Sequence, residues 1–251
     1  MLTSQRKSEI LAILKRDGQV LAKALSESFE VSEDTIRRDL RELASEGLLQ
    51  RVHGGALPAS PATADFAHRQ PIESATKRAV AKAAAGMVGS GQVVIVDGGT
   101  TAIELARQLP RELSATVVTH SPNVAVELVE HPGIEVIVIG GRLFKHSIVT
   151  VGAAAIEALS HIRADVYFMG VTGVHATAGL STGDLEEAYM KRALAAHAAE
   201  TVVLASADKL NAASQYRIGE LAMASAIIVE KSTDAELTEP LEAAGVTVVR
   251  A

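Results

Sequence analysis

The feature that most limits how this chain folds is a series of short apolar segments that recur after residue 75. Segments such as 93–96 (VVIV) and 135–139 (EVIVI) alternate with stretches whose apolar residues have helical spacing. A strand that is apolar on both faces is typical of a parallel sheet covered by helices on both sides. The pattern therefore predicts an α/β fold with a parallel sheet over residues 75–251. The expected helices are 75–88, 100–109, 121–130, 151–161 and 184–199, and the expected strands are 93–96, 116–119, 135–139, 165–169, 201–205, 226–229 and 246–249.

Composition narrows the chemistry that this chain can perform. Aromatic residues make up only 3% of the chain, so the core must be built from Ala, Val, Ile and Leu. The absence of cysteine excludes disulfides, Cys-based zinc sites and a Cys nucleophile. The histidines show no ligand spacing with carboxylates, so we expect no metal site and no cofactor. No apolar run reaches the roughly 18 residues that a membrane span needs, and no signal segment follows Met1. We therefore expect a cytoplasmic protein without a membrane partner.

Residues 1–57 have a different pattern, in which three short helices precede a glycine-containing turn. Helices are expected at about 4–16, 21–29 and 32–45, and Ser32 suits the N-cap of the third. The segment 48–56 then reads as a β-wing with a glycine tip. This order predicts a winged helix-turn-helix domain over residues 1–57, a proline-containing linker over 58–74 and a second domain over 75–251.

The outer face of the expected third helix carries groups that suit DNA recognition. The N-terminal residues of a recognition helix reach base edges, and guanidinium groups pair bidentately with guanine or phosphate. The alternative is an ordinary surface helix whose arginines are neutralised by Asp39 and Glu42; the two preceding helices and the wing favour DNA binding. The expected DNA-binding residues are Ser32, Thr35, Arg37, Arg38, Arg41, Arg51, His53, Gly54 and Gly55. Because operators are usually read by symmetric dimers, we expect a homodimer or homotetramer bound to operator DNA.

The acidic net charge of −6 does not exclude a nucleic-acid partner. Residues 1–57 hold nine Lys/Arg and nine Asp/Glu, whereas the rest of the chain holds 15 and 21. The excess of acidic groups therefore lies outside the expected DNA-binding domain, whose arginines are concentrated between residues 37 and 51. A local basic face, and not the net charge, is the relevant electrostatic property.

The segments Val31–Leu40, Gly47-Leu48 and Arg51–Ala56 resemble the N-terminal domain of the DeoR family of sugar-responsive bacterial regulators. The resemblance extends over essentially the whole chain, and it implies a C-terminal effector domain related to sugar-phosphate isomerases. It also implies a site role for Glu187 and Lys191, with Lys191 facing an anionic ligand. Lys77 stands at the family's usual position, where it could contact a phosphate. The family usually has Asn where this chain has His120.

A candidate anion site can be recognised from the residues alone. Asp97-Gly98-Gly99-Thr100-Thr101 follows a buried strand and opens a helix. Free N–H groups, two hydroxyls and the helix dipole favour an anion there, at the edge of a parallel sheet where ligands bind. The alternative is a strand-to-helix turn with Thr100 as its cap.

Other polar residues follow neighbouring strands and could converge on the same crevice. His120 could instead be a helix-entry residue bonded to backbone, Lys77 a solvated lysine, and Glu187 with Lys191 an ordinary i,i+4 pair on a helix that Asp184 caps. The expected effector-binding residues are Lys77, Asp97, Gly99, Thr100, Thr101, Thr119, His120, Ser121, Gly140, Gly141, Glu187, Lys191 and Lys209.

Together these features predict a DNA-binding transcriptional regulator, of the repressor type, of a carbohydrate-metabolism operon. The expected effector is a phosphorylated sugar or related metabolite that closes the crevice and changes the pose of the DNA-binding domains. One alternative is an isomerase- or hydrolase-like enzyme with an appended DNA-binding module, in which Asp97, Asp165 or Glu187 acts as general base. Another is a DNA-binding protein whose second domain only oligomerises.

Overall fold

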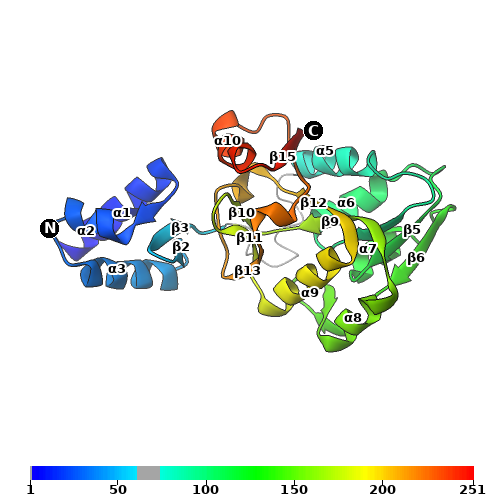
Figure 1. Ribbon diagram of the computed structural model, residues 1–251, viewed down its shortest axis with the longest axis horizontal. Coiled ribbons are helices and arrows are strands. Elements are labelled where there is room, and N and C mark those ends of the chain that lie inside the picture. The colour runs from blue at the N-terminus through cyan, green and yellow to red at the C-terminus, as the bar shows by residue number, and fades with distance from the viewer. Residues whose placement is uncertain (1, 61–73) are drawn as a thin grey trace.

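The computed structural model describes residues 2–60 and 74–251, in a small N-terminal part and a larger α/β part (Figure 1). The N-terminal part contains α1 (Thr3–Asp17), β1 (Val20–Leu21), α2 (Ala22–Ser28), α3 (Glu33–Ser45), β2 (Leu49–Val52) and β3 (Gly55–Pro58). Its three strands form a small antiparallel sheet in the order β1-β3-β2. The winged helix-turn-helix is confirmed, although β1 is too short to leave a pattern in the sequence.

Local sequence explains how the N-terminal part folds. Gly18 ends α1 with φ of 71°, and the Ser32 hydroxyl caps α3 by accepting from the Thr35 N–H at 3.2 Å. A Cβ on Gly55 would lie 1.9 Å from the Val20 carbonyl oxygen, so only glycine lets β3 approach β1 this closely. The core formed beneath the wing contains Ile10, Leu14, Val20, Ala22, Leu25, Ile36, Leu40, Leu43, Leu49 and Ala56.

The larger part is built on a seven-stranded, fully parallel sheet in the order β15-β14-β12-β9-β4-β5-β6. Its strands are β4 (Val93–Val96), β5 (Ala115–Thr119), β6 (Ile134–Val138), β9 (Ala164–Gly170), β12 (Ala198–Leu204), β14 (Ala226–Val229) and β15 (Thr247–Arg250). The helices are α5 (Ser74–Ala85), α6 (Thr100–Gln108), α7 (Pro122–Glu127), α8 (Ala153–Glu157), α9 (Leu185–Ala196) and α10 (Ala235–Ala243). The predicted α/β class and parallel sheet are confirmed.

Both faces of this sheet are buried by helices, as the apolar strands predict. On β4, Val94 and Val96 pack in one core cluster with α5, α6 and α7, whereas Ile95 packs in the other with α8, α9 and α10. Successive side chains of a strand point to opposite faces, so a strand between two helical layers is apolar at every position.

Several elements differ from the prediction. The sequence pattern missed the hairpin of β7 (Arg142–Phe144) and β8 (Val149–Val151), the antiparallel sheet of β10 (Gly173–His175), β11 (Gly179–Thr182) and β13 (Tyr216–Gly219), and helix α10. The hairpin strands are only three residues long, and Pro240 lies inside α10, so neither shows a clear period. The helix expected at 184–199 ends at Ala196, because the chain from Ala198 joins β12.

The two parts are joined through the end of β3. Ala59 forms a parallel bridge with Ala213, and the backbone N–H groups of Ser60 and Ala213 donate to Ala213 and Pro58 carbonyls at 3.3 Å each. The rest of the expected linker, 61–73, lies outside the described residues, so the domain boundaries stay a prediction. Within 2–60 and 74–251, no helix is long and apolar enough to cross a membrane, and no His, Asp and Glu side chains gather in a group of three or more that could hold a metal ion.

Candidate functional site

Two acidic residues of α3, Asp39 and Glu42, do not neutralise its outer arginines. Asp39 is buried and accepts from Arg6 of α1 at 2.5 and 3.1 Å, and Glu42 pairs with Lys7 of α1 at 2.7 Å. The alternative in which Asp39 and Glu42 pair the outer arginines is therefore wrong. Turning these acids toward α1 leaves the exposed face of the helix basic.

The three outer arginines of α3 differ in their surroundings. Arg37 pairs with Glu33 of the preceding turn at 2.8 Å, whereas Arg38 and Arg41 form no ion pair with the residues that the structure describes. All three are exposed. Thr35 and Ser32 lie at the N-terminus of the same helix and bond each other at 2.9 Å. This face can meet phosphates and base edges, with Arg38 and Arg41 as its unneutralised cations.

The wing exposes three of its four predicted DNA-binding residues. Arg51, His53 and Gly54 are exposed around its turn, and Gly54 has φ of 80°. Gly55, however, is buried against β1, which gives it a packing role. Arg51 and His53 also border a cleft of about 470 Å³ whose other wall includes the β10–β11 turn, so the wing faces the larger part of the protein.

A second feature is a cavity of about 440 Å³ at the carboxyl ends of the parallel strands. Gly99, with φ of 100°, begins α6 there, and Thr100 and Thr101 form its first turn. Seven of the thirteen expected effector residues line this cavity: Lys77, Gly99, Thr100, Thr101, Glu187, Lys191 and Lys209. A helix N-terminus with hydroxyls and three nearby lysines provides the donors and positive charge that an anion needs.

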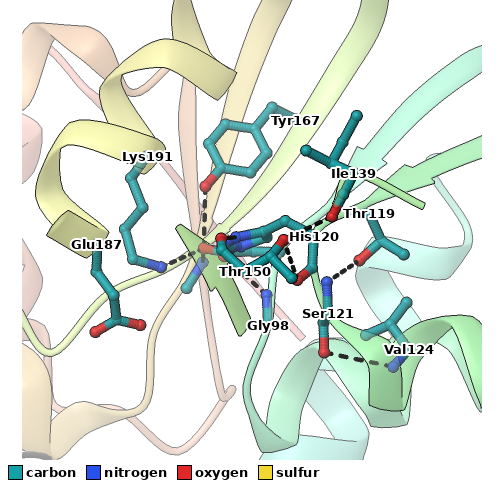
Figure 2. Close-up of polar contacts among 12 residues, drawn as sticks. Gly98, Thr119, His120, Ser121, Val124, Ile139, Thr150, Tyr167, Glu187 and Lys191 are labelled. Carbon is teal, nitrogen blue, oxygen red and sulfur yellow. Dashed lines mark hydrogen bonds and ion pairs between the residues drawn. The ribbon is translucent and has the colours of Figure 1, made fainter. Parts of the chain in front are cut away.

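Asp97 lies at the end of β4, fully buried and outside the cavity lining. Its Oδ1 accepts from Gly98 N–H and His120 Nε2 at 2.7 Å each, and its Oδ2 accepts from Tyr167 at 3.0 Å, Gly170 N–H at 2.8 Å and Lys191 Nζ at 2.5 Å (Figure 2). Burial alone would raise the pKa of Asp97, but the charge of Lys191 and the hydrogen bond from His120 outweigh it, so the pKa lies well below its ordinary value. Asp97 is therefore a saturated carboxylate with no oxygen left to accept from a ligand.

The remaining expected effector residues do not form part of the cavity lining. The Thr119 hydroxyl accepts from Ser121 N–H at 3.1 Å, and Ser121 caps α7 by accepting from Val124 N–H at 3.5 Å. Neither these two residues nor His120, Gly140 or Gly141 line the cavity. A Cβ on Gly141 would lie 2.9 Å from the Val151 carbonyl oxygen, which gives that glycine a packing role. Strand ends converge as predicted, but only some of their side chains reach the cavity.

Helix α9 contributes Glu187 and Lys191 to the cavity lining, but the two side chains bond other residues and not each other. Lys191 bonds Asp97, while Glu187 accepts from the Thr182 hydroxyl at 3.3 Å. Figure 2 shows both side chains extending from one face of the helix toward the site. Asp184 caps α9 by accepting from the Glu187 N–H at 3.0 Å, as its position predicts.

Comparisons with known proteins agree with this two-part architecture. A family profile described as a DeoR-like helix-turn-helix domain matches residues 6–62, and one described as the DeoR C-terminal sensor domain matches residues 72–231. An HTH-type transcriptional regulator GlpR of Haloferax volcanii is 35% identical over 99% of this chain and 98% of its own length. The glycerol-3-phosphate regulon repressor of Escherichia coli K12 is 29% identical over 92% of each chain.

The chain belongs to the DeoR family. As a DeoR-family protein it is a DNA-binding transcriptional regulator with a C-terminal sensor domain. Among solved structures, a ribose 5-phosphate isomerase of Methanocaldococcus jannaschii overlaps 53% of this chain and 52% of its own, with 22% identity and a TM-score of 0.40.

Part of the sensor cavity of this DeoR-family regulator could not be predicted from sequence. The β7–β8 hairpin supplies Phe144, His146 and Ser147, and Thr172 and Ser206 come from loops after β9 and β12. Three-residue strands and isolated hydroxyls carry no signal in a single sequence.

The cavity of this regulator is also walled by its DNA-binding part. Ala44, Gly47, Leu49 and Gln50 line the same cavity as the helix N-terminus of α6. A ligand there would lie beside both parts of the protein at once.

Proposed function

We propose that this regulator represses an operon of carbohydrate metabolism, and that a phosphorylated sugar or related metabolite in the 440 Å³ cavity controls its binding to operator DNA. The observation that carries the proposal is the composition of the cavity. The N-terminus of α6, Thr100 and Thr101 suit a phosphate, and the positive charges of Lys77, Lys191 and Lys209 border the same space.

The cavity also contains hydrogen-bond acceptors that suit the hydroxyl groups of a sugar. Glu187 and Asp208 line the cavity with carboxylate oxygens, and Asp208 already accepts from the Ser206 hydroxyl. Carboxylates accept hydrogen bonds from hydroxyls, whereas the helix N-terminus and lysines attract phosphate. A ligand that has both a phosphate and several hydroxyls matches this distribution of groups.

The position of the cavity suits control of DNA binding. Because it lies between the sensor sheet and the end of α3 and β2, a bound ligand can favour one relative pose of the two parts. A differential affinity that corresponds to about 1–3 kcal/mol would change operator affinity about 5- to 150-fold. A homodimer or homotetramer would present two recognition helices to a symmetric operator.

A thermal-shift screen of sugar phosphates tests the effector proposal. We expect stabilisation by at least one compound, and we expect Thr100→Ala to weaken it markedly because the substitution removes a hydroxyl at the anion site. Thr247→Val is the matched control, since it removes an exposed threonine hydroxyl on β15 away from the cavity. Equal stabilisation of wild type and Thr100→Ala would place the ligand elsewhere.

Gel shifts on DNA selected from a random pool test the regulatory proposal. The stabilising sugar phosphate should change the affinity for the selected DNA, and a reporter behind that DNA should be less active when the regulator is present. We also infer that the sensor part binds its ligand without chemical change. The buried Asp97 supports this, because its lowered pKa makes it a weak general base and both of its oxygens already accept hydrogen bonds. Conversion of the bound compound to an isomerised or hydrolysed product would establish the enzyme alternative instead.

A further inference from the structure

His120 is a fully buried residue that neither lines the cavity nor faces the DNA-binding part. It follows β5 and joins two elements through its ring. Its Nε2 lies 2.7 Å from Asp97 Oδ1 on β4, and its Nδ1 lies 2.9 Å from the Thr150 carbonyl oxygen on β8 (Figure 2).

These two contacts determine how many protons the ring carries. A backbone carbonyl oxygen can only accept, so Nδ1 carries hydrogen toward Thr150. Asp97 is an ionised carboxylate held by Lys191 and Tyr167, so its oxygens also accept and Nε2 must carry hydrogen too. Burial and the nearby charge of Asp97 raise the pKa of Tyr167 well above its ordinary value, so the phenol remains a donor. With hydrogen on both nitrogens, His120 is an imidazolium.

The groups bonded to Asp97 then carry unequal charge, because His120 and Lys191 are two cations and Asp97 is one anion. Glu187, which stands one turn before Lys191 on α9 and also lines the cavity, adds a second negative charge. If residue 120 were neutral, these two carboxylates would outweigh Lys191. The imidazolium therefore balances the four charges at the floor of the cavity, so that Lys191 can act on an anionic ligand.

His120 also holds β8 in place beside the anion site. The Thr150 N–H donates to the His120 carbonyl oxygen at 2.8 Å, so the two residues are joined through both backbone and ring. The adjacent Val149 packs so close to Gly98 that a Cβ there would lie 2.1 Å from its Cγ1. Since β7 and β8 carry the turn that supplies His146 and Ser147 to the cavity, His120 connects the Asp97 cluster to one of the cavity walls.

We propose that His120 is a positioning residue with hydrogen on both ring nitrogens, which fixes Asp97 to β8 and supplies the second cation that lets Lys191 attract an anionic effector. The effector half of this inference rests on the proposed function, whereas the protonation half does not.

Nitrogen-15 NMR of the histidine rings in the full-length, ligand-free protein tests the protonation directly. We expect both ring nitrogens of His120 to carry hydrogen at pH 7, with the resonance assigned through its NOEs to Thr150 and Tyr167. A ring nitrogen without hydrogen at pH 7 would overturn the proposal. This measurement needs no substitution, so it decides the question even if variants at this position do not fold.

Calorimetric titration with inorganic phosphate tests the consequence for anion binding. We expect His120→Asn to bind phosphate about tenfold more weakly than wild type, because one partly screened positive charge is lost. Thr150→Val is the matched control: it keeps the carbonyl that accepts from His120 and should stay within about twofold of wild type by the same reasoning. Equal affinities in wild type and a folded His120→Asn would overturn the role of the second cation.

The NMR signature separates a charged positioning residue from a merely structural one, because only a charged ring carries hydrogen on both nitrogens. Failure of wild type to bind phosphate would count against the proposed effector, and the NMR result would still decide the charge of His120.

Discussion

The two parts of this regulator each contain a buried ion cluster, and the clusters differ in balance and in place. In the DNA-binding part, Arg6 and Asp39 form a bidentate pair of one positive and one negative charge. In the sensor part, Asp97 lies between the two cations His120 and Lys191 beneath a cavity. Apolar side chains can replace a buried pair of equal and opposite charges at little cost in stability, whereas the cations bonded to Asp97 lie where they can act on a ligand.

The largest expected effect is that of Asp97→Ala. The substitution leaves two buried cations without their counter-charge, and we expect it to lower the free energy of unfolding by about 5 kcal/mol or more. Urea unfolding measures the change. Asp165→Ala serves as control, because Asp165 is an exposed carboxylate that accepts one N–H, from Val93, and should cost only about 1 kcal/mol. A loss for Asp97→Ala no larger than that of the control would show that the cluster is not a charge network.

The next effect sharpens the contrast between the clusters. Asp39→Ala strands one buried guanidinium and should cost about 3–5 kcal/mol, whereas the double variant Arg6→Met with Asp39→Leu should return to within about 2 kcal/mol of wild type. The corresponding double variant Asp97→Leu with Lys191→Met should not recover, because the Nε2 of buried His120 then loses its hydrogen-bond acceptor. Recovery in both double variants would show that the Arg6–Asp39 pair and the Asp97 cluster contribute to stability in the same way.

The difference between the clusters also shows what sequence can and cannot predict. Strands such as 93–96 and the anion loop at Gly99-Thr100-Thr101 are contiguous, so a local pattern reveals them. Asp97 and Lys191 are 94 positions apart, and no spacing rule connects them. The i,i+4 spacing of Glu187 and Lys191 instead suggests an ion pair within the helix. A rule based on local spacing cannot reveal that Lys191 pairs with the distant Asp97.

A smaller effect concerns the face of α3 that the Arg6–Asp39 pair leaves basic. Arg38→Ala or Arg41→Ala should weaken binding to the selected DNA by about 1–3 kcal/mol, and loss of a phosphate contact should reduce the salt dependence by about one charge. Arg37→Ala is the internal comparison, since Glu33 already partly neutralises that arginine, and a smaller loss is expected. Gel shifts at several salt concentrations measure all three. Unchanged binding by both Arg38→Ala and Arg41→Ala would contradict the assignment of α3 as the recognition helix.

The smallest effect comes from His175, a buried titratable group that forms no ion pair within residues 2–60 and 74–251. Burial lowers the pKa of His175 below its ordinary value, and its Nδ1 accepts from the Thr177 and Ala178 N–H groups at 3.2 Å each, so the ring is neutral. The unfolded chain then binds a proton more readily than the native state, so the stabilising contribution is complete above the ordinary pKa of about 6.5 and is lost as the pH falls below it. Urea unfolding at pH 7.5 and 5.5 should show a larger loss of stability for wild type than for His175→Gln.

Because Thr177 and Ala178 border the cleft that faces the wing, acid should also loosen the contact between the two parts. Equal pH dependence in both proteins would show that His175 titrates as an ordinary histidine and that the ion clusters alone set how stability responds to pH.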